Sequence, residues 1–261
     1  MATWVYLAAA ALLVLVAWQL LRSRQPATGP QPGPAYQPRV VKTRSTPEAY
    51  EKAVQNYEEL LERRHSAPLF RLLVMTHYTS QAHEAALATS QRFQRTLADE
   101  FSTADLVLHA HLYTSTGEPQ QAVAMYTQLL DQSISSAAIY NNRGYAYTML
   151  AEYLLAIQDC NQAIALHPRM AYAYNNRGLA LFRLGMSAEG RADIEHSLRL
   201  DRQNAYAHRN LGIYYFDQGD YLGALPHFER AHQLGSAPPE LAGYLRQTRQ
   251  QLGLSSAADE Q

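Results

Sequence analysis

Few groups of residues in this chain have the types and spacing that catalysis or metal binding requires. The segment His83–Leu87 reads HEAAL and starts like the helix of a zinc protease, but the second histidine of that motif is missing. His109 and His111 are two residues apart, so they point to different sides of a helix and form no metal pair. The sequence contains neither a glycine-rich phosphate loop nor a serine elbow. It therefore predicts no enzymatic activity, no cofactor and no metal site.

A different kind of chemistry is suggested by three asparagines. Asn142, Asn176 and Asn210 follow one another at intervals of 34 residues. An amide offers one acceptor and two donors, so it can bind both the carbonyl and the N–H of an extended peptide, whatever the peptide's sequence. A fold that places the three on one surface would make them a ladder for a peptide backbone. The alternative interpretation, that they are solvated residues of a repeat consensus, remains open.

These asparagines belong to a longer repeat of the same period. The pentapeptide YNNRG at Tyr140–Gly144 recurs at Tyr174–Gly178, and HRNLG follows at His208–Gly212. From about Pro47 onward apolar residues recur three and four positions apart, which indicates helices, and Pro and Gly fall between the blocks. Small residues occupy two further columns, which comprise Ala156, Gly190 and Ala224, and Ala163, Ser197 and Ala231.

This pattern resembles the tetratricopeptide repeat family, whose unit is a 34-residue helix-turn-helix with small residues at helix crossings. The resemblance implies an all-α fold, a right-handed α-solenoid of such repeats, which we expect to be preceded by one transmembrane helix. The unit at residues 171–204 departs from the family pattern at Gly190, Ser197 and Arg202, and these departures predict a weaker second helix. The expected units are 137–170, 171–204 and 205–238, a divergent repeat at 103–136, a divergent helical part at 47–102, a capping helix at 239–253 and a disordered tail at 254–261.

The small columns have a physical reason. Gly or Ala at a helix crossing allows the two backbones to approach closely, and bulky Tyr or Phe fills the space elsewhere. We therefore expect Gly178→Leu to overpack its crossing by roughly 1–3 kcal/mol. Cys160, the single cysteine, falls in an interior column and is predicted to be a small buried residue.

By analogy with the family, particular first-helix positions line a concave groove that binds a protein or peptide. One subclass of the family clamps carboxylates with Lys and Arg, but here Asn141, Tyr145, Tyr206 and Asn210 occupy those positions, which argues against that ligand. We expect Ala at Asn142, Asn176 and Asn210 to weaken partner binding and to leave thermal unfolding nearly unchanged. The predicted binding residues are Asn141, Asn142, Tyr145, Tyr172, Asn175, Asn176, Arg183, Tyr206, Arg209 and Asn210.

The N-terminus predicts a membrane anchor. Residues 4–21 carry no charge and would span about 27 Å as a helix, close to the hydrocarbon thickness of a bilayer. A cleaved secretory signal is the competing interpretation, but no basic residue precedes the segment and no small-residue cleavage site follows it. Arg22 and Arg24 follow the segment, so we expect a single-pass membrane protein with its repeats in the cytoplasm. Residues 22–46, rich in Pro, Gly and Gln, form the expected linker.

The composition limits the classes of partner that the protein could bind. The formal charge is −1, so the protein has no net positive charge that would attract nucleic acid. The favoured function is a membrane-anchored adaptor that holds a protein or peptide in its groove. A second hypothesis is a co-chaperone or transport receptor that handles extended client segments, and a third is a module that only forms homo-oligomers.

Overall fold

The computed structural model describes residues 46–235 and 240–254, and this part of the chain contains twelve α-helices and no strand. The predicted span at 4–21 and tail residues 255–261 lie outside the described residues, as does all of the predicted linker except Thr46. Among the described helices, none combines the length and the apolar character needed to cross a bilayer. The all-helical solenoid expected from the repeat is confirmed.

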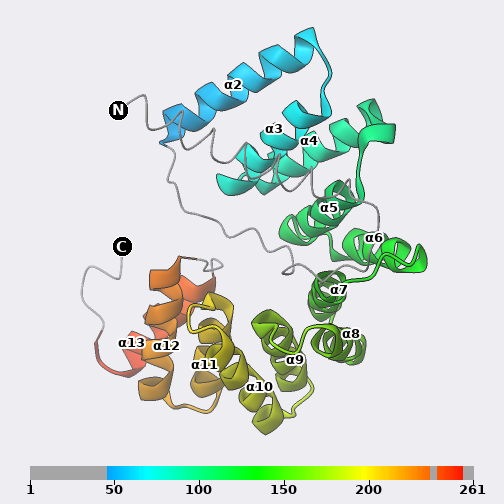
Figure 1. The fold of residues 1–261 in the computed structure, drawn as a ribbon. Helices are drawn as coiled ribbons and strands as arrows, with labels where there is room; N and C mark the ends of the chain where they lie inside the picture. The colour runs from blue at the N-terminus through cyan, green and yellow to red at the C-terminus, as the bar shows by residue number, and fades with distance from the viewer. Residues whose placement is uncertain (1–45, 236–239, 255–261) are drawn as a thin grey trace. The chain divides into compact units, whose positions relative to one another are not determined.

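Ten of the helices form five hairpins that follow one another in chain order (Figure 1). The first helices of the last four hairpins begin one 34-residue period apart. Helices α5, α7 and α9 each contact the first helix of the following hairpin, as in other solenoids. The hairpins are α3 (Ala67–Thr79) with α4 (His83–Thr96), α5 (Thr103–Ser115) with α6 (Pro119–Asp131), α7 (Ala137–Met149) with α8 (Tyr153–Leu166), α9 (Ala171–Arg183) with α10 (Ser187–Leu200), and α11 (Ala205–Asp217) with α12 (Tyr221–Leu234).

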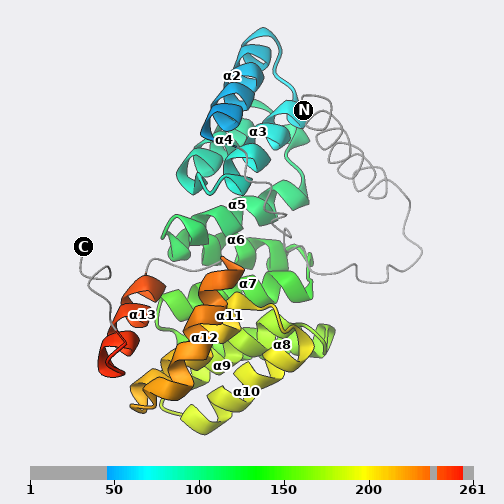
Figure 2. The same ribbon diagram turned by 90° about the vertical axis from the view of Figure 1, so that its left-hand side faces the viewer.

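A single helix flanks the hairpins at each end (Figure 2). The first, α2 (Pro47–Arg63), begins where the sequence signals a helix start, because the Thr46 side chain accepts a hydrogen bond from the Ala49 N–H at 3.3 Å. The last, α13 (Glu240–Gln251), buries Leu241 and Leu245 against the apolar cluster around Phe228 of α12. These two helices cover the apolar faces that the terminal hairpins would otherwise expose.

The N-terminal hairpin is offset from the strict period. Helix α3 begins 36 residues before α5, because a 3₁₀ turn at Ala98–Glu100 (η1) lengthens the connection to α5. Arg71 of α3 bridges this connection, with Nη2 donating to the Asp105 carboxylate and to the Glu100 carbonyl, both at 2.7 Å. The irregular spacing explains why sequence reasoning could not place the register of this unit.

The helix crossings use small residues as expected. Gly144 faces Cys160, which is fully buried, so the cysteine has the packing role predicted for it. Burial raises the pKa of the Cys160 thiol to about 12. At the next crossing Gly178 faces Gly190, and a Cβ on either residue would lie 2.6 Å from the other's carbonyl oxygen. Helix α10 is 14 residues long, as are α8 and α12. The departures of the 171–204 unit from the family pattern therefore do not shorten its second helix.

Every hairpin closes through three residues, of which the middle one has positive φ. Gly occupies this position in three hairpins, whereas Ala151 has φ 60° and Gln81 has φ 63°. A residue with a Cβ pays about 1–2 kcal/mol in this conformation. We therefore expect Ala151→Gly to raise the free energy of unfolding by about 0.5–1 kcal/mol, after the larger entropy of unfolded glycine is subtracted.

The matched control for this turn is Gly185→Ala. Gly185 lies one repeat later with φ 83°, and no atom would lie within 4 Å of an added Cβ, so only backbone strain acts. This variant should lose about as much stability as Ala151→Gly gains. Urea unfolding followed by circular dichroism measures both, and equal signs for the two variants would contradict the explanation.

Candidate functional site: the first-helix face

A chain of hydrogen-bonded amides joins the first helices α7, α9 and α11. Asn210 Nδ2 donates to Asn175 Oδ1 at 2.9 Å, which links α11 to α9. Asn175 Nδ2 donates to its neighbour Asn176 at 3.2 Å. Asn176 Nδ2 then donates to Asn141 Oδ1 at 3.0 Å, which links α9 to α7, and Asn141 Nδ2 donates to Asn142 Oδ1 at 3.0 Å. Consecutive repeats are therefore tied together by side-chain amides.

The amide chain is largely inside the protein. Asn141, Asn175 and Asn210 are each 2% exposed and Asn176 is 8% exposed, whereas Asn142 is half-buried. The two asparagines of each YNNRG pentapeptide thus act together, because the first accepts from the following repeat and donates to the second. Sequence reasoning placed these residues on a common surface but did not foresee that they bond to one another.

Two side chains end the amide chain. Arg209 donates from Nε and Nη2 to Asn210 Oδ1, at 3.1 and 2.9 Å. At the opposite end Asn142 adjoins Tyr126 of α6. Burial raises the pKa of Tyr126, and the Asn142 amide offsets part of that rise. Every amide oxygen of the chain accepts a hydrogen bond, and all of them except that of Asn142 belong to buried side chains, so the amide chain presents little surface to a ligand.

This arrangement revises one expectation from the sequence. Asn176 and Asn210 are buried and bonded, so Ala at these positions removes hydrogen bonds that hold the repeats together. Whether the asparagines also contact a ligand stays a prediction.

Asn175→Ala should destabilise the protein by about 2–4 kcal/mol, because it leaves Asn210 Nδ2 and Asn176 Oδ1 buried without partners. Denaturant unfolding measures this loss. Asn161 serves as a control. Its amide belongs to α8, outside the amide chain, and accepts a hydrogen bond from Arg177 in an exposed contact. An Asn175→Ala loss no larger than that of Asn161→Ala would contradict the role of the amide chain.

Tyr145, Tyr172 and Tyr206 form a second group, here called the tyrosine face. They come from α7, α9 and α11, and the Tyr172 and Tyr206 rings meet edge to face with centroids 6.4 Å apart. Burial raises the pKa of Tyr206, Tyr145 raises it further, and Arg209 offsets part of the rise. Tyr206 nevertheless remains 40% exposed. The three predicted tyrosines therefore converge and stay accessible.

The other predicted groove residues divide into two groups. Arg183 is exposed at the end of α9, and no carboxylate in the described residues pairs with it. No contact joins Arg183 to the tyrosine face. By analogy with the family, Leu179 of α9 and Ile213 of α11 would also line the groove, but they are only 8% and 6% exposed, so they serve packing.

An arginine clamp, which sequence reasoning missed, joins a first helix to the second helices of its own hairpin and of the preceding one. Arg143 forms a bidentate pair with Asp159 of α8, at 2.7 and 2.8 Å, and also bonds Thr127 of the preceding hairpin at 3.1 Å. The same three contacts recur one repeat later. The sequence did carry a signal for this clamp, because an Arg, an Asp and a third polar residue each recur after 34 residues. The second set comprises Arg177, Asp193 and Asn161.

The spacing and the contacts find a counterpart in known proteins. Three stretches match tetratricopeptide repeat families, at residues 107–171, 171–204 and 205–236. Residues 107–236 belong to the tetratricopeptide repeat family. Tetratricopeptide repeats generally mediate protein–protein interactions through their extended surfaces.

Solved structures show the same fold. The chain is similar to a chain of the APC/C hetero-tetramer Cut9–Hcn1, with 17% identity and a TM-score of 0.61, over 78% of this chain and 40% of that one. It is also similar to the type IV pilus biogenesis factor PilW, with 19% identity and a TM-score of 0.56, over 74% and 89%. MamA from Desulfovibrio magneticus RS-1 shares 21% identity with a TM-score of 0.48, over 64% and 94%.

In the last tetratricopeptide repeat the clamp is replaced. Leu211 stands in the place of the arginine and His227 in the place of the aspartate. The Nδ1 atoms of His208 and His227 are 3.2 Å apart, and the His227 ring stacks on Tyr215. The last repeat therefore lacks both charged residues of the clamp, so neither charge is buried without its partner.

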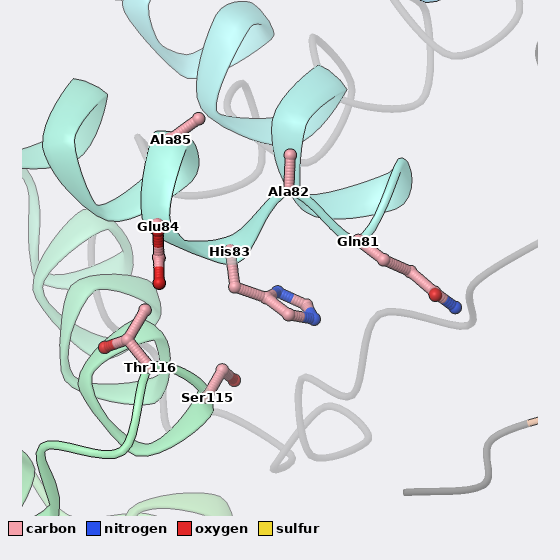
Figure 3. A pocket seen from close by; sticks show the side chains of 7 residues that line it. All are labelled: Gln81, Ala82, His83, Glu84, Ala85, Ser115 and Thr116. Atoms are coloured by element: carbon pink, nitrogen blue, oxygen red, sulfur yellow. The ribbon is translucent and has the colours of Figure 1, made fainter. Parts of the chain in front are cut away.

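The HEAAL segment borders an open pocket of about 460 Å³ (Figure 3). His83 and Glu84 at the start of α4 lie there across from Ser115 and Thr116 at the turn between α5 and α6. The described residues hold no group of three His, Cys, Asp or Glu side chains arranged for a metal ion. The Ser115 and Thr116 hydroxyls donate to the main-chain carbonyls of His111 and Leu112, at 3.1 and 3.0 Å.

His109 and His111 point to separate neighbours. His111 Nε2 lies 3.0 Å from the Tyr78 hydroxyl, whereas His109 stacks on Tyr113 with ring centroids 5.0 Å apart. His109 is 1% exposed, and neither ring nitrogen has a hydrogen-bond partner. Burial lowers the pKa of His109 to about 4.

This burial predicts acid sensitivity. As the pH falls below about 6.5, His109 becomes protonated in the unfolded chain, whereas in the folded chain it stays neutral until about pH 4. The stability contribution is therefore complete above pH 6.5 and is lost as the pH falls toward 4. His109→Phe keeps the stacking and removes the titration, so its free energy of unfolding should fall less between pH 7 and 5 than that of the parent. Parallel pH profiles for the two proteins would contradict this assignment.

Proposed function

We propose that this protein is a membrane-anchored adaptor that binds a partner protein through the tyrosine face of its tetratricopeptide repeats. The observation that supports this most directly is the convergence of Tyr145, Tyr172 and Tyr206 from three successive repeats beside Arg209. Tyr and Arg are the residue types that dominate binding energy at protein interfaces. Here they are accessible and are held on helices that the amide chain fixes relative to one another.

The rigid base beneath the face favours tight binding. Interfaces lose affinity when side chains and loops must be ordered on association. In this protein the amide chain and the arginine clamp already hold the first helices in place, so the rings meet a ligand with little further ordering. We infer that an extended segment, lying across α7, α9 and α11, is the simplest ligand for such a row.

The anchor is part of the proposal. Residues 4–21 are apolar and uncharged, and the Pro-, Gly- and Gln-rich segment that follows provides a spacer. Arg22 and Arg24 follow the apolar segment, which favours a cytoplasmic location for the repeats. The adaptor would then bring its partner to the membrane surface. Protease protection of the repeats in sealed vesicles tests this topology.

Site-specific photocrosslinking tests the binding surface. A photoreactive amino acid at Tyr206 in the full chain should give a discrete adduct in membranes. A second substitution, Tyr172→Ala, should reduce that adduct because it removes the neighbouring ring. The matched control position is Leu166 at the end of α8, which is 44% exposed, close to the 40% of Tyr206, and is not part of the face. A partner adduct from Leu166 and none from Tyr206 would refute the proposed site.

Self-association is a second candidate, and one observation favours it. Leu154 of α8 and Leu222 of α12 occupy equivalent positions two repeats apart and are 73% and 76% exposed. Both leucines leave most of their apolar surface in water, and a second copy of the chain could bury it. Sedimentation of the purified chain, with Leu154→Ser and Leu222→Ser as the comparison, separates this function from adaptor binding, because these changes should not alter the Tyr206 adduct.

A further inference from the structure

We infer that two copies of this chain pair through the outward face of α8, with the two α8 helices antiparallel. This inference deepens self-association, the second candidate function, and does not depend on a ligand at the tyrosine face. Three features of the outward face support it: the absence of charge, the exposed leucines near both of its ends, and an order of residues that is nearly the same in both directions.

The outward face is the side of α8 that no neighbouring helix covers. Helix α8 packs on α7 and α9 (Figure 1), and the side that carries Cys160 is buried. At about 100° per residue, the exposed residues of the helix point away from Cys160. Asn161, at the edge of the exposed side, accepts a hydrogen bond from Arg177. The outward face comprises Leu154, Leu155, Gln158, Gln162, Ala165 and Leu166.

No residue of the outward face carries a charge. The one charged residue of α8 is Asp159, which is buried and bound by Arg143. Each of the other second helices exposes at least one charged side chain. These are Glu84 and Arg95 on α4, Asp131 on α6, Glu189 and Arg199 on α10, and Arg230 on α12. Because the centres of protein interfaces are depleted in charged residues, α8 is the second helix best suited to a contact.

Leucines are concentrated on the outward face. Leu154 is 73% exposed, and Leu155 and Leu166 are 41% and 44% exposed. Single exposed leucines are ordinary on protein surfaces, but three on one uncharged helix face form an apolar patch. A second molecule that covers the patch would remove this apolar surface from water.

The order of residues on the outward face identifies that molecule as a second copy. Leu154 and Leu166 each lie six residues from Cys160, on opposite sides of it, and Leu155 and Ala165 each lie five residues from it. The two glutamines each lie two residues from it. A two-fold axis through the outward face at the level of Cys160 would place each of these residues against its counterpart in an antiparallel copy. Apolar side chains then meet apolar ones, and amides meet amides.

The side chains at the centre of the outward face suit such an axis. A two-fold axis brings identical residues close together, so a charged residue near it would repel its own copy. Gln158 of one copy would instead lie against Gln162 of the other, and an amide can both donate and accept a hydrogen bond. The symmetric order of residues offers no advantage to a chemically different partner, whereas a second copy matches all of it.

Cysteine crosslinking of the full chain tests the pairing. Cys160 is the single native cysteine, and burial raises its pKa to about 12, so the parent chain should react little with a short bismaleimide. Gln158→Cys should crosslink with itself, because its two copies would lie about 6 Å apart along the helix axes. The two copies of Leu154 would lie about 18 Å apart. Leu154→Cys should therefore crosslink poorly with itself and several-fold better when it is co-expressed with Leu166→Cys.

A charge placed on the outward face tests the same surface without a crosslinker. Leu154→Asp would bury a carboxylate against Leu166 of the second copy, so sedimentation should show dimerisation that is at least about tenfold weaker. The matched control is Leu222→Asp on α12, since the 76% exposure of Leu222 is close to the 73% of Leu154. This control should leave dimerisation unchanged. Both side chains are exposed, so circular dichroism should show the parent fold for both variants.

Dimers that give no Gln158→Cys crosslink, or that Leu222→Asp weakens as much as Leu154→Asp does, overturn the inference and leave self-association standing. Crosslinking of Leu154→Cys with itself that equals its crosslinking with Leu166→Cys overturns the antiparallel arrangement. A chain that stays monomeric refutes self-association together with the inference. The adaptor function is tested separately by the Tyr206 adduct. A photoadduct of Leu166 with a second copy contains only peptides of this chain, so it is distinct from a partner adduct.

Discussion

Replacing Arg143 by methionine should cost about 3–5 kcal/mol of unfolding free energy, one of the two largest effects that we expect in this protein. The change keeps much of the side-chain volume but removes the bidentate partner of Asp159, whose side chain is only 6% exposed. It also removes the contact to Thr127 of the preceding repeat. An unpaired carboxylate would then remain buried between α7 and α8. Denaturant unfolding of the purified chain measures the loss.

An exposed ion pair provides the control for this prediction. Arg191 pairs with Glu195 one helical turn away, at 2.7 Å, but the two side chains are 43% and 35% exposed. Exposed pairs of this kind contribute at most about 0.5 kcal/mol, so Arg191→Met should be nearly neutral apart from its ring contacts. Similar losses for the two methionine variants would mean that burial of the carboxylate is not the cause.

The last repeat indicates how the loss of Arg143 could be rescued. There the chain itself carries Leu211 and His227 at the positions of the clamp. The double change Arg143→Leu with Asp159→His should therefore be more stable than Arg143→Leu alone, because no buried carboxylate is left without a partner. A double variant that is less stable than the single one would contradict this explanation.

Gly190→Ala should destabilise the protein by about 1–3 kcal/mol, although sequence comparison within the chain suggests the reverse. Ala156 and Ala224 occupy the same position in neighbouring repeats, and alanine is the better helix former by about 1 kcal/mol. At Gly190, however, the added Cβ would lie 2.6 Å from the Gly178 carbonyl oxygen and 2.9 Å from the Phe182 nitrogen. Both atoms belong to the backbone, so α9 and α10 must move apart.

Gly243→Ala in α13 is the matched control for this crossing. Gly243 is also inside a helix, but no atom would lie within 4 Å of its added Cβ. Helix propensity then acts alone, and the variant should gain about 0.5–1 kcal/mol. Opposite signs for the two glycine-to-alanine changes in urea unfolding are the expected result. Stabilisation by Gly190→Ala would show that the crossing has room for a methyl group.

The helices of this protein were predictable because their signals are local and repeated. The YNNRG pentapeptides set the period, and prolines and glycines marked the ends of the helical blocks. The N-terminal hairpin was harder to place, because η1 shifts its register by two residues relative to the 34-residue period. The apolar segment at 4–21 is also a local signal, but it lies outside the described residues and the anchor stays a prediction.

The tyrosine face was partly predictable, since the position of each residue within a known type of repeat indicates which side of the first helix it occupies. The contacts of the asparagines were not predictable in this way. Whether Asn176 faces a ligand or donates to Asn141 depends on how closely α9 approaches α7, a distance that neither helix encodes alone. The same holds for Arg143, whose partners belong to two different helices.

The sequence by itself therefore determined the all-helical repeat, the places where helices begin and end, and the small residues at their crossings, because each depends on residues close together in the chain. Only the tertiary structure decided that the amides bond to one another and that their oxygens are engaged. It also decided that Gly178 and Gly190 leave no room for a methyl group. These outcomes depend on differences of a few tenths of an ångström in the distances between side chains and backbones that are brought together only when the hairpins pack.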